Sequence, residues 1–174
     1  MKIFKSLLAV LSLAFVFSTA VFAQQNVSLP GLNGQTVSLT NQKGKVVVLS
    51  VGASWLPLST NQAAITAELA KRYAGKDVAL YFVATDSTAA KSKNYASNDE
   101  IQAFAAKNKI NIPILRDSDG TVTTKTYKAD QIPSFIIIDK NGEIFGEPFG
   151  GVTPNAKSEK DLTNLISQKI DGLL

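Results

Sequence analysis

Continuous and alternating apolar runs mark the predicted strands of this chain. Residues 46–51 are apolar apart from Ser50, and residues 78–85 form a second apolar run; both are typical of buried strands in a parallel sheet. The alternation at 27–29 and 36–39, around a Pro-Gly-Leu-Asn-Gly turn, predicts an N-terminal hairpin or two edge strands. Further strands are predicted at 112–115, 135–138 and 143–149, the last two joined by an Asp-Lys-Asn-Gly turn.

Helical periodicity separates the first two long strands. Ile65, Leu69 and Tyr73 recur at a spacing of four, which predicts an amphipathic helix. Glu68 lies four residues before Arg72, the spacing at which opposite charges pair on a helix.

Two more helices are predicted in the second half of the chain. Ser97 and Glu100 fit a capping box, so a helix is expected to begin there. Its apolar face is formed by Ile101, Phe104 and Ala105. The last helix carries one apolar stripe, formed by Leu162, Leu165, Ile166 and Ile170. Residues 121–128 are predicted to be a short helix or irregular, and the polar segment 86–98 a loop, either solvated or contacting a partner.

After the N-terminal hairpin, these elements follow the order β-α-β-α-β, then a β-hairpin, then α. Strands that alternate with helices require right-handed crossovers and a shared sheet. The sequence therefore predicts an α/β fold with a mixed central sheet flanked by helices. No linker or repeat interrupts the pattern, so residues 24–174 are predicted to form a single domain.

The first 23 residues have the pattern of a secretory signal peptide. Lys2 and Lys5 precede an apolar stretch at 7–17, and a small-residue cleavage site ends at Ala23. The apolar stretch is shorter than the roughly 20 residues of a membrane-spanning helix, which disfavours an uncleaved anchor. We therefore expect a periplasmic or extracellular protein with no membrane span after cleavage.

Composition narrows the chemistry available to this chain. Its 174 residues include no cysteine and no histidine, which excludes disulfides, thiolate nucleophiles, Cys/His zinc sites and Ser-His-Asp triads. Loss of Lys2 and Lys5 lowers the net charge from +4 to +2, so nucleic-acid binding has no support. We expect no cofactor, no metal and no catalytic residue. A mature chain of about 150 residues can bury a hydrophobic core large enough to stabilise the fold without disulfides.

Two segments carry a resemblance to a known family. Residues 53–59 read Ala-Ser-Trp-Leu-Pro-Leu-Ser after a buried strand, and residues 132–139 read Ile-Pro-Ser-Phe-Ile-Ile-Ile-Asp. With their spacing, they resemble the active-site and cis-proline segments of thioredoxin-like thiol-disulfide oxidoreductases of the TlpA/redoxin type. The resemblance covers residues 27–165. It implies a thioredoxin-like fold and a cis peptide bond before Pro133.

The chain departs from this family at the reacting groups. The resemblance places the two active-site cysteines at Leu56 and Ser59, and the buried acid at Ser50. Leucine does not ionise, and a serine hydroxyl without an adjacent base is a poor nucleophile. We therefore expect neither dithiol exchange nor peroxide reduction. The sequence also allows a structural role for Ser59: Ser59 and Gln62 fit a helix-capping box. Alternatively, Thr60 or Asn61 caps the helix.

Loss of chemistry leaves binding as the main hypothesis. In the family, the residue before the cis-proline offers its backbone to an extended segment, a role Ile132 can retain. The candidate binding face consists of Trp55, Leu56, Pro57, Leu58, Ser59, Ile132 and Pro133. In the alternative interpretation, Leu56 and Leu58 pack under a neighbouring loop and have no binding role. We expect a redox-inactive module that binds a protein or peptide partner.

Other interpretations stay open. One is an enzyme with relocated carboxylate or lysine chemistry at the same cleft, and another is an assembly subunit that uses the last helix. The acidic segments at 117–119 and 139–141 could suggest calcium, but the twelfth position of an EF-hand loop counted from Asp117 is Lys128. We interpret both segments as turns.

Overall fold

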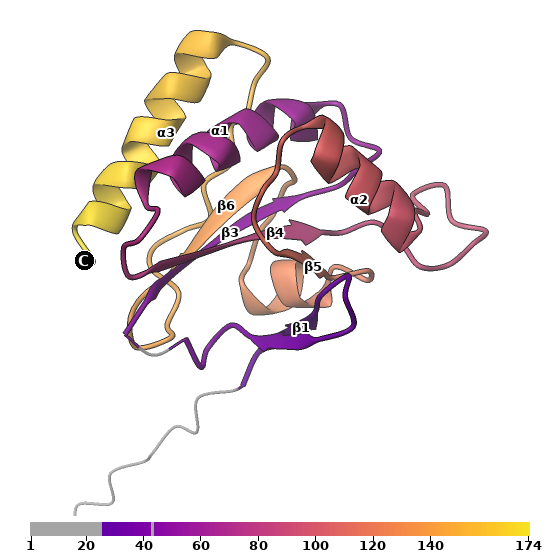
Figure 1. The fold of residues 1–174 in the computed structure, drawn as a ribbon, viewed down its shortest axis with the longest axis horizontal. Helices are drawn as coiled ribbons and strands as arrows, with labels where there is room; N and C mark the ends of the chain where they lie inside the picture. Colours follow the sequence, from indigo (N-terminus) through magenta and orange to yellow (C-terminus); the bar gives the residue numbers. More distant parts are fainter. Residues whose placement is uncertain (1–25, 43) are drawn as a thin grey trace, which may run out of the picture.

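The computed structural model describes residues 26–42 and 44–174, so the predicted signal segment 1–23 lies outside the described residues. Its centre is a four-stranded sheet in the order β5-β4-β3-β6 (Figure 1). The strands are β3 (Val46–Gly52), β4 (Val78–Ala84), β5 (Ile114–Arg116) and β6 (Ser134–Ile138). β3, β4 and β5 are parallel, and β6 is antiparallel to β3. The predicted mixed sheet is confirmed.

The N-terminal hairpin forms as predicted and extends the sheet region at β5. β1 (Ser28–Pro30) pairs antiparallel with β2 (Thr36–Ser38). Immediately after β1, Gly31 forms a bridge to Leu115, which joins the hairpin to the outer edge of β5.

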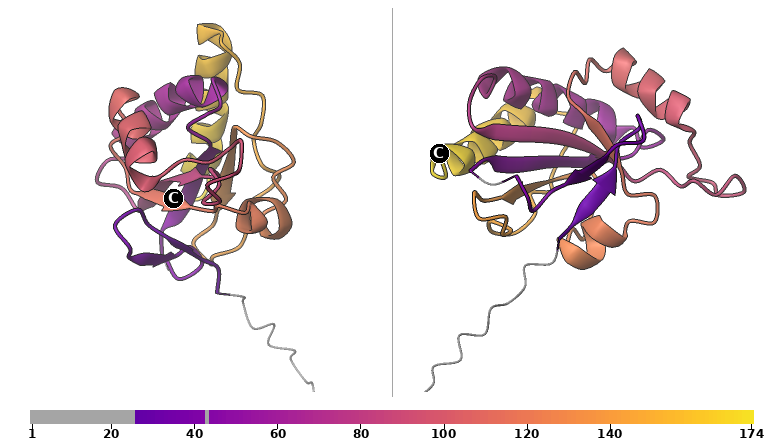
Figure 2. Two further views of the ribbon diagram at one scale, coloured as in Figure 1. Left: turned by 90° about the vertical axis from the view of Figure 1, so that its right-hand side faces the viewer. Right: turned by 60° about the horizontal axis from the view of Figure 1, so that its bottom comes forward.

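Helices cover one face of the sheet, and the hairpin lies against the other (Figures 1 and 2). α1 (Leu58–Arg72) and α3 (Ala156–Asp171) pack side by side, with α2 (Asn98–Lys107) beside α1. The Ser97–Glu100 capping box at the start of α2 is confirmed. Residues 121–126, predicted as a short helix or irregular, form a single π-helical element, η1 (Thr121–Thr126), on the hairpin side.

Alternate residues of β3 enter two different clusters, because successive strand side chains point to opposite faces. Val46 and Val48 pack with Ile65 and Leu69 of α1 and with Ile166 of α3. On the hairpin side, three other residues of β3 pack in a cluster with residues of β1 and β6: Val47, Leu49 and Val51. β3 is therefore buried on both faces, as its continuous apolar run predicts.

Two expectations about the C-terminal region are wrong. Residues 143–149 form no strand; only Ile144 and Phe149 bridge to β6. Gly146 has a positive φ of 71°, and Pro148 lacks a backbone N–H. The chain therefore leaves the sheet between the bridges at Ile144 and Phe149. Leu165, expected in the buried stripe of α3, is 43% exposed.

No helix within the described ranges is both long and apolar enough to span a membrane.

Two polar contacts hold the C-terminal end of α1. The predicted pair is present, with Arg72 Nη2 lying 3.4 Å from Glu68 Oε1. Arg72 also donates to Ser167 Oγ on α3 at 2.8 Å, so it links the two helices.

Replacing Tyr127 by phenylalanine is expected to leave the protein as stable or about 1 kcal/mol more stable at neutral pH. The side chain is 4% exposed, and its hydroxyl has no hydrogen-bond partner among the residues that the structure describes. Burial raises the pKa of Tyr127 above its ordinary value of 10.0, so the unfolded chain loses the proton first. Wild-type stability should therefore fall as the pH rises above 10, and Tyr127→Phe should lessen that fall.

Urea unfolding of both proteins at neutral and alkaline pH measures this effect. Tyr73→Phe is the matched control, because the Tyr73 hydroxyl donates to the Ser167 carbonyl and to Asp171 Oδ1, each at 3.0 Å. That control should lose about 1 kcal/mol. A larger loss for Tyr127→Phe than for Tyr73→Phe would contradict the prediction.

Candidate functional site

The loop between β3 and α1 presents the first predicted segment. Trp55 is 43% exposed, Pro57 is exposed, and Leu56 and Leu58 are half-buried. Two backbone hydrogen bonds shape the loop: Leu56 N–H donates to the Ala53 carbonyl at 3.2 Å, and Ser59 N–H donates to the Leu56 carbonyl at 2.9 Å. The loop is therefore a compact turn that leads directly into the helix.

Ser59 is not a helix cap. α1 begins at Leu58 with Pro57 as its N-cap residue and no capping side chain, so neither Thr60 nor Asn61 fills that role. Ser59 is buried inside the first turn, where its Oγ accepts a hydrogen bond from Ala53 N–H at 3.1 Å. The expected capping box is wrong, because proline at the N-cap starts the helix earlier than the Ser-x-x-Gln pattern suggests.

Gln62 joins the two predicted segments. This fully buried side chain donates from Nε2 to the Val51 carbonyl at 2.8 Å and to the Ser134 carbonyl at 3.0 Å. Val51 precedes the exposed loop on β3, and Ser134 follows the proline of the second segment. Gln62 thus fixes the spacing between these two parts of the candidate face.

The second segment has the geometry that the resemblance implied. The Ile132–Pro133 peptide bond is cis. Pro133 is buried and Ile132 is half-buried. Neither the N–H nor the carbonyl of Ile132 has a hydrogen-bond partner among the described residues, because the pairing of β6 with β3 begins at Ser134. These backbone groups are available to an external strand.

A hollow of about 360 Å³ has Ile132 among its lining residues. It is enclosed by three segments: 85–94, 118–124 and 129–132. None of the loop residues 54–59 lines it. Of the predicted face, only Ile132 therefore contributes to this hollow, and Trp55 lies outside it.

Sequence reasoning missed Asp86, which holds the exposed loop in place. Asp86 is fully buried, although it begins a segment read as a polar loop. Its carboxylate accepts hydrogen bonds from Ser54 N–H at 3.0 and 3.1 Å and from the Ser54 hydroxyl. The residue before Trp55 is thus tied to the end of β4.

Arg116 is the second residue that was missed. Its guanidinium donates to the carbonyls of Asp86, Ser87 and Ala96 and to Asn98 Oδ1. These acceptors lie at the two ends of the loop that follows β4, so the Arg116 side chain reinforces a closure that the Ser87–Tyr95 backbone bridge also makes. The only sequence signal is an arginine directly after two apolar strand residues.

The acidic side chains of the turn at 117–119 accept backbone hydrogen bonds. Asp117 accepts from Val122 N–H and Thr123 N–H at 3.3 and 2.8 Å. Asp119 accepts from Thr121 N–H at 2.9 Å, and this backbone hydrogen bond lowers the pKa of Asp119. Within the described ranges, no three acidic, histidine or cysteine side chains gather as a metal site.

The chemical capacity of this region follows from its groups. The exposed loop carries no thiol, and the Ser59 hydroxyl has no basic side chain among its hydrogen-bond partners. What the region offers instead is an exposed indole, half-buried leucines and an unpaired backbone segment.

Comparison with known proteins places these features in a wider group. The model of the AhpC/TSA family matches residues 23–145. The thioredoxin-like protein YneN of Bacillus subtilis is 31% identical over 133 residues, covering 76% of this chain and 73% of YneN. The thiol-disulfide oxidoreductase ResA of Bacillus cereus is 25% identical over 134 residues, covering 77% of this chain and 72% of ResA.

Solved structures show the same fold. The pneumococcal exposed lipoprotein thioredoxin Etrx1 of Streptococcus pneumoniae superposes with a TM-score of 0.64 at 27% identity, covering 85% of this chain and 99% of Etrx1. A putative thiol:disulfide interchange protein DsbE of Chlorobium tepidum gives a TM-score of 0.66 at 23% identity, covering 86% and 94% of the two chains. The predicted thioredoxin-like fold is confirmed.

Proposed function

Because this chain belongs to the AhpC/TSA family but contains no cysteine, we propose that it is a redox-inactive binding module for an extended polypeptide segment. The observation that carries the proposal is the unpaired backbone of Ile132 beside the cis-proline. An extended chain can add to such a segment through main-chain hydrogen bonds, which need no thiol.

The surroundings of Ile132 support the same proposal. Trp55 and Pro57 are exposed, and Leu56 and Leu58 are half-buried, so the chain offers apolar contact area at this end of the sheet. Exposed apolar residues that gather on one face often mark protein-binding sites. Asp86 and Gln62 hold the two segments in fixed positions, which lowers the entropy cost of binding.

Export belongs to the same proposal. It rests on the basic residues Lys2 and Lys5, the apolar stretch 7–17 and the cleavage pattern ending at Ala23. The similarity to Etrx1, an exposed lipoprotein thioredoxin, supports this part of the proposal. We place the mature module in the periplasm or the extracellular space.

Site-specific photo-crosslinking in the native cell envelope tests the proposal. A photoreactive residue at position 56 should give a discrete adduct containing a polypeptide, whereas one at the exposed Lys160 should not. If position 56 gives no adduct, the proposed face is idle.

Leu56→Asp is expected to reduce partner capture at least tenfold, because it puts a charge into the apolar contact area. The measurement is the yield of adduct from a probe at position 55 in the variant. Leu165→Asp on α3 is the control, since it puts the same charge on an exposed leucine away from the loop between β3 and α1. Both variants should keep the wild-type circular dichroism spectrum. Equal loss in the two variants would argue against this face.

A further inference from the structure

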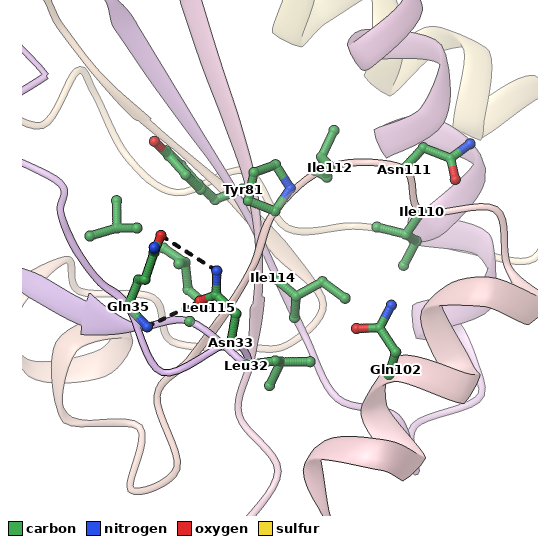
Figure 3. Close-up of a pocket in the computed structure, with 13 residues that line it drawn as sticks. Leu32, Asn33, Gln35, Tyr81, Gln102, Ile110, Asn111, Ile112, Ile114 and Leu115 are labelled. Atoms are coloured by element: carbon green, nitrogen blue, oxygen red, sulfur yellow. Dashed lines mark hydrogen bonds between the residues drawn. The ribbon is translucent and has the colours of Figure 1, made fainter.

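A second hollow lies beside the outer edge of β5, which is the edge that does not pair with β4. The proposed function does not use this hollow. Its volume is about 680 Å³, within the usual range for small-molecule sites. It is bounded by the hairpin turn at 31–37, by Tyr81 of β4, by Gln102 of α2, and by residues 110–115 leading into β5 (Figure 3). We call it the amide pocket.

The hairpin wall of the amide pocket is preformed. Gly31 N–H donates to the Gln35 carbonyl at 2.7 Å, and Leu32 N–H donates to the Ile114 carbonyl at 3.3 Å. A Cβ at Gly31 would lie 3.2 Å from the Gln35 carbonyl oxygen, so the turn is tightly closed at this position. The backbone of the hairpin wall is therefore fixed by hydrogen bonds.

Apolar side chains form the floor of the amide pocket, and carboxamides form its rim. Ile110 and Ile114 are buried. The exposed carboxamides of Gln102 and Asn111 have no hydrogen-bond partner among the described residues. Figure 3 shows Gln102 and Asn111 on one side of the segment that carries Ile112 and Ile114, and Asn33 and Gln35 on the other; the Asn33 carboxamide donates to that of Gln35 at 3.5 Å.

Tyr81 adds one hydroxyl to this lining. It is half-buried, and its hydroxyl has no partner among the described residues. Burial raises the pKa of Tyr81, so the hydroxyl stays protonated and can donate. None of the residues lining the amide pocket is charged.

We propose that the amide pocket binds a neutral saccharide. A sugar ring has an apolar C–H face and an edge of uncharged hydroxyls, which match the isoleucine floor and the carboxamide rim. Each carboxamide supplies donors and an acceptor, as vicinal hydroxyls require. A phosphate or carboxylate would be desolvated against the floor without an opposite charge, which disfavours charged ligands.

Titration of the protein with neutral disaccharides tests this inference. The probes are cellobiose, maltose and N,N′-diacetylchitobiose, followed through the side-chain amide resonances in ¹H–¹⁵N spectra. At least one should shift the resonances of Gln102 and Asn111 saturably at millimolar concentration. A uronic acid disaccharide of the same size should bind about tenfold more weakly.

A matched pair of variants separates binding from folding. Asn111→Leu removes one carboxamide of the rim and should weaken the binding of the responsive disaccharide about tenfold. Gln168→Leu removes an exposed carboxamide from α3 and should leave binding unchanged. The proposal is overturned if no neutral disaccharide shifts these resonances, if the acidic one binds as well, or if Asn111→Leu binds normally. None of these outcomes depends on the polypeptide-binding face.

Discussion

A Leu56→Cys/Ser59→Cys double variant is expected to reduce a disulfide substrate at a rate well above background, whereas the wild-type protein should show none. Position 56 immediately precedes Pro57 at the start of α1, where the helix dipole lowers a thiol pKa and favours the thiolate. The hydrogen bond from Ser59 N–H to the Leu56 carbonyl brings these residues within disulfide-forming distance. The backbone of Ile132, which we propose binds an extended chain, would hold the disulfide substrate beside the new thiols.

Insulin reduction with dithiothreitol as the electron source measures this gain. The matched control is Asn155→Cys/Ser158→Cys, which places the same cysteine spacing at the N-terminus of α3. That control has a helix dipole but lacks the cis-proline segment, so it should show little activity. A double variant at 56 and 59 that forms the disulfide but is no more active than the control would mean that the preserved framework cannot position a substrate.

The largest stability loss is expected for Arg116→Met, about 3 kcal/mol or more. Methionine matches the length of the stem but removes the guanidinium donor from the carbonyls of Asp86 and Ala96, whereas the Ser87 carbonyl keeps its hydrogen bond from Ala96 N–H. The loop between β4 and α2 would then open at both ends. Urea unfolding measures the loss, and hydrogen exchange should show faster exchange in residues 86–97.

Arg72→Met provides the comparison, because Arg72 and Arg116 are the two arginines of the chain. Arg72 is partly exposed; it pairs with the exposed Glu68 and donates to the buried Ser167 hydroxyl between α1 and α3. It should cost about 1 kcal/mol or less and leave exchange in residues 86–97 unchanged. Equal losses in the two variants would show that Arg116 does not close the loop.

Periodicity predicted the elements that depend on burial. The runs at 46–51 and 78–85 became β3 and β4 because an uninterrupted apolar strand is stable only when both faces are covered. The Ser97–Glu100 box became the start of α2 because both partners of a capping box lie within one turn. Local rules are sufficient in such cases.

The candidate site was less predictable because its key contacts join residues far apart in sequence. Asp86 meets Ser54 across 32 positions, and Gln62 meets Ser134 across 72. No local pattern distinguishes a buried Asp86 that anchors a loop from a solvated one. The segments at 53–59 and 132–133 were found only through their resemblance to a family, whereas the residues that brace them required coordinates.

The wrong predictions have tertiary causes. In α3, Thr163 and Ser167 are buried while Leu165 is exposed, because helix α1 packs against that stripe. The Arg72–Ser167 hydrogen bond satisfies one of these buried hydroxyls. A hydrophobic stripe read from sequence assumes an apolar partner, and here the partner presents a polar side chain.

The place of α3 in the core has a consequence for biosynthesis. Ile166 and Ile170 complete the cluster that covers Val46 and Val48. More than a hundred positions separate these contacts in the chain, so a ribosome must synthesise nearly all of the described sequence before this cluster can close. A nascent chain that cannot close its core early stays unfolded longer, which is the state required for threading through a membrane channel if the proposed export takes place.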